Sequence, residues 1–223
     1  MRMKTFDWLG REFVAVSCEG ADGVPADQGM DGILDRIEAG IGPLGLSLDD
    51  TVRTRLWGRD RESRNLGSQA RSRRMRGGAR SSSSSYIAPG HLDSEATVAL
   101  DFVAMRSGGG KKLVEYDPPI VPLRYLDLQG LVFLSGVTST EGNLAEQVTE
   151  VCGLIGESLE HAGVSWEQAV LVSFFLHQAE DPAALKEAFG RAVTPVPART
   201  EWSFVEGYSA QGKLIEIEVT AQR

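Results

Sequence analysis

The chain has 223 residues, of which 42% are hydrophobic, and its formal net charge is −8. This length suits one large or two small domains, and no stretch approaches the roughly 20 consecutive apolar residues of a membrane-spanning helix. The start, MRMKTFDWLG, lacks the apolar block of a secretory signal, so we expect a cytoplasmic location. Two cysteines and three scattered histidines predict neither a disulfide nor a metal site, and we expect no cofactor and no membrane partner.

The first half contains a basic segment after its first predicted strand and helix. The strand is expected at 13–20, and the helix carries a buried stripe at Met30, Ile33, Leu34, Ile37 and Ile41. Residues 53–80 hold ten arginines, against only Asp60 and Glu62. Such a segment is ordinarily a solvated helix face; the alternative is a site for an anionic partner at Arg71, Arg73, Arg74 and Arg76. Under that alternative, replacing the four arginines should weaken binding and leave folding intact.

The chain repeats its pattern at an offset of 118 residues. FVAVSCEG (13–20) falls on LVFLSGVT (131–138), and LGLSLDDTVRTRLWG (44–58) falls on AGVSWEQAVLVSFFL (162–176). The apolar stripe of the first helix falls on Val148, Val151, Cys152, Ile155 and Leu159, so Cys152 is predicted to lie in a core. The repeat predicts one unit at 1–106, a linker at 107–118 and a second unit at 119–223.

The second half shows the order of elements most clearly. Strands are expected near 121–128, 131–137, 169–177, 199–206 and 213–222, and helices near 144–162 and 181–192. This order predicts an α+β fold in which each unit is a mixed sheet covered on one face by two helices. The GGGKK of the linker (108–112) does not have the spacing of a phosphate-binding loop.

The last two strands place an arginine and several acids together. Side chains alternate between the faces of a strand, so Arg199 and Glu201 share one face, and Glu216 and Glu218 share the face opposite Ile217. A surface salt bridge would account for this pattern, and so would a site that binds a carboxylate. The pattern alone leaves both interpretations open.

These residues carry a resemblance to the Rid (reactive intermediate deaminase) family, also called YjgF or L-PSP. The matching motifs are FLSG (133–136), HAGVSWEQAVLVSFFL (161–176), EDPAALKEAF (180–189), PAR (197–199) and IEIE (215–218). The resemblance implies two tandem units with a fold similar to bacillus-type chorismate mutase, assembled as trimeric barrels with pockets between neighbouring units. It also implies that Arg199 binds a substrate carboxylate and that Glu216 positions the water that attacks an imine carbon.

The chain departs from the family pattern at its expected site. The resemblance places Ser135, Gly136 and Val137 against the substrate, but typical deaminating members read SGQ there and have an aromatic residue where Leu123 stands. Glu201 adds a second acid beside the arginine and is a further candidate for the acid/base role. A substrate other than the usual small 2-imino acid is therefore plausible.

The first half departs further from the family pattern. The resemblance makes Arg80 the counterpart of Arg199, with Ala99 opposite Glu216 and Asp101 opposite Glu218. The serine run at 81–85 has the composition of a linker, but the repeat favours a strand with Ser82 and Ser84 facing the cleft. We expect this half to be a degenerate unit that builds the trimer.

Three functions remain open from the sequence. The first is an enzyme that deaminates or hydrolyses an imine, enamine or related carbonyl compound bearing a carboxylate, as a tailoring step in specialised metabolism. The second is a non-catalytic ligand-binding or assembly protein on the same scaffold. The third is RNA cleavage, which the basic segment favours and the acidic second half opposes.

Overall fold

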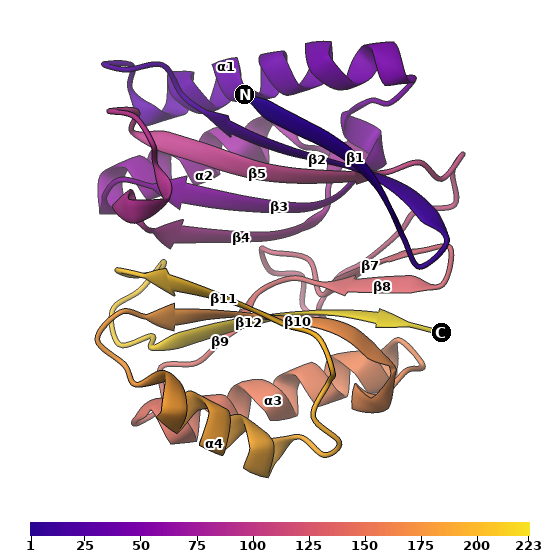
Figure 1. Ribbon diagram of the computed structural model, residues 1–223, viewed down its shortest axis with the longest axis vertical. Coiled ribbons are helices and arrows are strands. Elements are labelled where there is room, and N and C mark those ends of the chain that lie inside the picture. The colour runs from indigo at the N-terminus through magenta and orange to yellow at the C-terminus, as the bar shows by residue number, and fades with distance from the viewer. The chain divides into compact units, whose positions relative to one another are not determined.

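The computed structural model describes all residues from 1 to 223 and divides them into two units, Met1–Lys111 and Lys112–Arg223. Each unit is a mixed β-sheet with two helices packed on one face, which confirms the predicted α+β class (Figure 1). The two units are described separately.

The first unit has a five-stranded sheet in the order β1-β2-β5-β3-β4. Only β3 and β4 run parallel; the other neighbours are antiparallel. Its elements in chain order are β1 (Arg2–Trp8), β2 (Arg11–Glu19), α1 (Ala26–Ile41), β3 (Thr51–Gly58), α2 (Arg61–Arg74), β4 (Ser82–Ile87) and β5 (Val98–Met105). The serine run forms β4, as the repeat predicted, because its backbone is paired along β3.

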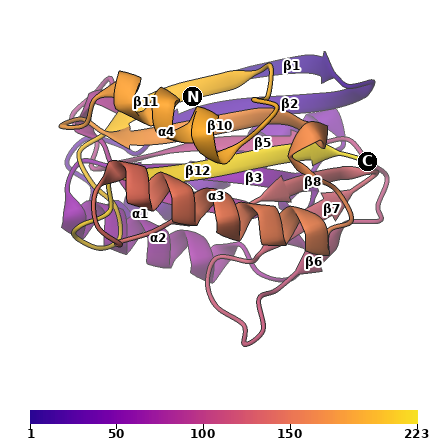
Figure 2. The same cartoon turned by 90° about the horizontal axis from the view of Figure 1, so that it is seen from below.

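The second unit repeats this plan with additional short strands. Its sheet has the order β11-β10-β12-β8-β7-β6, and β9 pairs with β12. The elements are β6 (Lys112–Val114), β7 (Tyr125–Leu128), β8 (Leu131–Leu134), β9 (Val137–Thr138), α3 (Leu144–His161), β10 (Ala169–His177), α4 (Pro182–Ala192), β11 (Thr200–Val205) and β12 (Ile215–Gln222). The helices α3 and α4 lie side by side on one face of this sheet (Figure 2).

Both predicted helical stripes lie in the cores. The five stripe residues of α1 are fully buried against apolar residues of β2 and β5, and the stripe of α3 packs in the same way against β10 and β12. Cys152 is 4% exposed in this second core, and burial raises the pKa of its thiol to about 12. The predicted core position of Cys152 is therefore confirmed, and the thiol is unreactive at neutral pH.

The segment 107–118, expected as a linker, contains a strand and a half-buried lysine. β6 pairs with β7 inside the second unit, while Lys111 belongs to the first. The Lys111 ammonium donates hydrogen bonds to the backbone oxygens of Asp49 (3.1 Å), Thr51 (2.6 Å) and Gly78 (2.6 Å). Lys111 therefore fastens the end of the first unit to the turns before β3 and before β4.

The environment of Lys111 predicts a dependence of stability on pH. Burial lowers the pKa of its ammonium from 10.5 to about 8, against the opposing effect of Asp49 and Asp50. The folded state thus loses this proton before the unfolded chain does, so the contribution of Lys111 to the free energy of unfolding rises between about pH 8 and 10.5. Urea unfolding measures the free energy of unfolding of the native chain and of Lys111→Met. The difference between the two should change in favour of the native chain as the pH rises over this range. Parallel pH profiles would contradict it.

Candidate functional site

The expected acids lie on the face of the second sheet that points away from α3 and α4. Glu218 on β12, Ser173 on β10 and Glu201 on β11 stand in one row across three neighbouring strands. The Ser173 hydroxyl donates a hydrogen bond to a Glu201 carboxylate oxygen at 3.0 Å. Ile215, Ile217 and Val219 point to the opposite face and enter the core. This face therefore carries the polar groups, as the alternation of the strands predicted.

Glu216 lies on the same face, one step further along β12, against the backbone of Gly136. β9 pairs with β12 so that Thr138 is the partner of Glu216, and this pairing brings the Ser135–Gly136 turn beside the glutamate. A Cβ atom on Gly136 would lie 1.8 Å from Glu216 Oε1, so no other residue fits there without moving the carboxyl group. Glu216 is 7% exposed. The turn and the carboxylate thus form one packed arrangement.

Ser135 and Val137, on either side of Gly136, are both buried in the fold. Ser135 is buried, and its backbone N–H donates to the Arg124 carbonyl at 3.5 Å. Val137 is also buried and pairs with Ile217. Gly136 lies directly against the Glu216 carboxyl group.

Tyr208, which the sequence did not single out, lies close to Glu216. Its hydroxyl donates to the carbonyl oxygen of Phe175 at 2.7 Å and lies 3.1 Å from the carbonyl oxygen of Leu214, the alternative acceptor. Burial, and then the nearby charges of Glu216 and Glu180, raise the pKa of Tyr208, so its phenol stays protonated. A lone tyrosine in a loop carries no sequence signal for such a position.

Arg199 stands at the far end of this face from Glu216. Its carbonyl accepts the N–H of Val172, which places Arg199 level with Leu171, whereas Glu216 pairs with Phe175. Along the strands the two residues are four positions apart, about 13 Å. Across the sheet they are two strand spacings apart, about 10 Å. That distance exceeds the combined reach of the two side chains. Within one unit, Glu201 is the closer acid along the chain.

The corresponding face of the first unit supplies its arginine from a different strand. Ser82 pairs with Arg53, and Ser84 pairs with Arg55 beside Asp101. This register puts Ser82, rather than Arg80, at the level that Arg199 occupies in the second unit. The side chain of Arg53 donates to the Ser82 hydroxyl at 3.3 Å. Arg80 lies outside β4, two residues before it begins.

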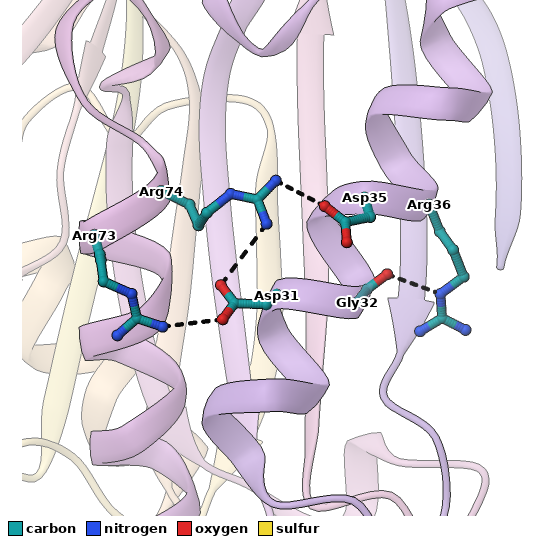
Figure 3. Close-up of polar contacts among 6 residues, drawn as sticks. All are labelled: Asp31, Gly32, Asp35, Arg36, Arg73 and Arg74. Carbon is teal, nitrogen blue, oxygen red and sulfur yellow. Dashed lines mark hydrogen bonds and ion pairs between the residues drawn. The ribbon is translucent and has the colours of Figure 1, made fainter.

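The basic segment is largely engaged within the first unit. Arg71 is 6% exposed and donates to Thr54 Oγ1 (3.3 Å), the Ser84 carbonyl (2.8 Å) and Ser85 Oγ (2.9 Å). Arg73 and Arg74 on α2 point toward α1, where Asp31 pairs with both and Asp35 pairs with Arg74 (Figure 3). Of the four arginines proposed for an anionic partner, Arg76 is the one without such a contact.

The burial of Arg71 corrects the expectation that replacing these arginines would leave folding intact. Arg71→Met should lower the free energy of unfolding by about 2–4 kcal/mol, because it removes three charge-assisted hydrogen bonds and leaves a buried carbonyl without its donor. The exposed Arg76→Met is the matched control and should change stability by less than about 0.5 kcal/mol. Urea unfolding followed by circular dichroism compares them; equal effects would contradict the structural role of Arg71.

No helix in the structure combines the length and apolar character needed to cross a bilayer. The cytoplasmic location remains an expectation from the sequence.

Comparisons with known proteins cover the second unit and the fold as a whole. Residues 123–223 match the family model described as Endoribonuclease L-PSP. Protein mmf2, mitochondrial, of Schizosaccharomyces pombe is 34% identical over 100 residues, which cover 41% of this chain and 79% of that protein. The solved structure of a chorismatase is similar over 98% of this chain and 79% of its own, with a TM-score of 0.70 and 16% identity.

Single-unit structures match about half of the chain. Rv2704 from Mycobacterium tuberculosis, of the YjgF/YER057c/UK114 family, covers 51% of this chain with all of its own length, at 20% identity and a TM-score of 0.47. The likeness to the chorismatase shows that the two-unit fold is a known one. Since the match to the fission-yeast protein covers most of that protein at 34% identity, and the family model covers the second unit, the chain belongs to the L-PSP family, also called YjgF or Rid.

Proposed function

We propose that the chain is a Rid-like enzyme that hydrolyses an imine, or a related enamine or carbonyl compound, carrying a carboxylate. The observation that carries this proposal is the packing of the Glu216 carboxyl group against the Gly136 backbone. A carboxylate held in one position by its surroundings can orient a water molecule and accept its proton. Arg199, which is exposed, provides a planar guanidinium for the substrate carboxylate.

The proposed reaction balances without a cofactor. Water held by Glu216 attacks the imine carbon; a C–O bond forms, and the carboxylate takes one proton from the water. That proton passes to the nitrogen and gives a carbinolamine. The remaining hydroxyl proton then moves through Glu216 to the nitrogen, so that the carbonyl forms, the C–N bond breaks and ammonia leaves. The substrate carboxylate stays bound to Arg199 by two parallel hydrogen bonds.

The separation of Arg199 and Glu216 within one unit bears on assembly. Because the two side chains cannot contact each other within one copy, we propose that Arg199 of one copy meets Glu216 of a neighbouring copy in a homotrimer. β11, which follows Arg199, is an edge strand and can lie against such a neighbour. Glu201, beside the arginine, would then limit the carboxylates that bind.

The trimer is a prediction with a direct measurement. Light scattering at micromolar concentration should give about three times the 24.1 kDa mass of one chain. A stable monomer under these conditions would contradict both the trimer and the shared site.

The activity is tested with a substrate panel. Ammonia release should be measured with 2-imino acids generated in the assay, with variants that lack Arg199 or Glu216 as controls. Chorismate belongs in the panel, because the protein that shares the two-unit fold is a chorismatase; since chorismate contains no nitrogen, its consumption rather than ammonia release should be measured. The proposal fails if no member of the panel is turned over faster by the native chain than by the Glu216 variant.

RNA cleavage has less support than small-molecule chemistry. Three of the arginines that favoured it, Arg71, Arg73 and Arg74, are engaged with Asp31, Asp35 and the serines of β4, which leaves fewer of them for a nucleic-acid backbone. A non-catalytic binding role would be indicated by carboxylate binding at Arg199 without turnover of any panel member.

A further inference from the structure

The first unit contains a cavity of about 480 Å³ that the proposed reaction does not use. It lies beside the last residues of β2, which β1 does not cover. β1 begins at Arg2, opposite Ser17, whereas β2 continues to Glu19 (Figure 1). A volume of this size accommodates a small metabolite. The lining side chains that matter to the argument are Ser17, Glu19, Arg36, Trp57, His91 and Asp101.

One side of the cavity is anionic and fixed. Asp101 accepts hydrogen bonds from the Ser17 hydroxyl (2.5 Å) and from the Trp57 indole N–H (2.9 Å), one on each carboxylate oxygen. Both donors are neutral, so these bonds orient the carboxylate without cancelling its charge. Trp57 is 4% exposed and is covered by the parallel ring of His91 at a centroid distance of 4.0 Å. Asp101 therefore keeps lone pairs and charge available for a cationic group.

The other side of the cavity is cationic. Arg36, on α1, donates to two backbone oxygens, those of Gly32 (3.1 Å; Figure 3) and Glu19 (2.5 Å), and forms no ion pair with a carboxylate. These carbonyl contacts hold the guanidinium at the end of β2 and leave its charge uncompensated. Such a group binds a carboxylate well, because the guanidinium is already oriented.

Glu19 and Asp93, which also line the cavity, are held in place. The Glu19 carboxylate accepts the Asp93 N–H at 2.8 Å and the Ser94 hydroxyl, and Arg59 donates to the carbonyl of Ala96 at 3.0 Å. Burial acts to raise the pKa of Glu19, but the hydrogen bonds from Ser94 and Asp93 and the charge of Arg2 lower it overall. The loop that carries His91 is thus fixed without a ligand, which lowers the entropic cost of binding.

We infer that this cavity binds a small zwitterion of amino-acid size, with its ammonium group at Asp101 and its carboxylate at Arg36. A simple carboxylate would meet the negative charges of Asp101 and Glu19, and a simple amine would meet the positive charges of Arg36 and Arg2. A zwitterion satisfies both sides and is small enough for the volume. This site is separate from Arg199 and Glu216, so the first unit has a binding role of its own.

Calorimetry on the full chain tests the inference with glycine, L-alanine, L-serine and L-glutamate, and with acetate and ethylamine as single-charge controls. At least one amino acid should bind, and neither control should bind measurably. Asp101→Asn and Arg36→Gln should each weaken that binding by about 10- to 100-fold, the loss of one charge-assisted contact. Arg36 is exposed, so Arg36→Gln tests the site even if Asp101→Asn disturbs the fold.

Arg199→Ala is the control that separates this cavity from the proposed reaction site. Amino-acid binding should survive that substitution unchanged, whether or not the chain turns over an imine. The inference is overturned if no amino acid binds below about 10 mM, or if binding persists unchanged in both Asp101→Asn and Arg36→Gln. It is also overturned if Arg199→Ala abolishes the binding, which would place the ligand in the second unit.

Discussion

Replacing Glu216 with glutamine is expected to lower turnover by about 10²- to 10⁴-fold and to leave the affinity for a carboxylate mimic nearly unchanged. Glutamine has the shape of glutamate and can fill the same space beside Gly136, but its amide cannot accept the proton of an attacking water. The rate of ammonia release and the calorimetric affinity should be measured on the same preparation. A variant that lost binding as well as turnover would indicate a structural role for Glu216.

Two further variants identify which carboxylate acts. Gly136→Ala should reproduce the loss of turnover, because the added Cβ would lie 1.8 Å from Glu216 Oε1 and must displace the carboxyl group. Glu201→Gln should have a smaller effect, because Glu201 accepts a hydrogen bond from Ser173, which an amide oxygen also accepts. If Glu216→Gln kept full activity and Glu201→Gln lost it, the acid/base role would belong to Glu201.

Much of the fold could be predicted from local patterns. The apolar residues of α1 and α3 repeat every three to four positions, and this spacing predicts a helix that buries one face. The strand at the serine run was predicted from the internal repeat, against its composition. The alternation in β12 likewise placed Glu216 and Glu218 on the face opposite the core.

The features that escaped prediction depend on contacts between distant residues. The register of the sheet puts Ser82, rather than Arg80, at the level of Arg199. This register is set by the pairing of β4 with β3, and a sequence alignment contains no information on that pairing. Arg71 resembles its exposed neighbours in sequence, yet its side chain is buried by β3 and β4. The bond between Trp57 and Asp101 joins residues on different strands, so no local pattern indicated the cavity.

Replacing Arg199 with alanine is expected to weaken binding of the carboxylate ligand by more than about 100-fold, since two charge-assisted hydrogen bonds are lost. Arg199 is exposed, so the free energy of unfolding should change by less than about 0.5 kcal/mol. Arg199→Lys is the matched control: it keeps the charge but not the planar pair of donors, and should restore binding only in part. Calorimetry and urea unfolding provide the two measurements. Unchanged affinity in Arg199→Ala would remove the arginine from the site.

Combining the two inactive variants tests whether one site uses residues of two copies. If Arg199 of one copy meets Glu216 of the next, every mixed trimer of Arg199→Ala and Glu216→Gln chains contains one site with both native residues. Random assembly of equal amounts should then recover about one quarter of the native activity. If both residues instead served a site within one copy, no mixture would recover activity. Zero recovery in trimers shown by mass to be mixed would therefore reject the shared site, while the single-variant losses would still support the reaction.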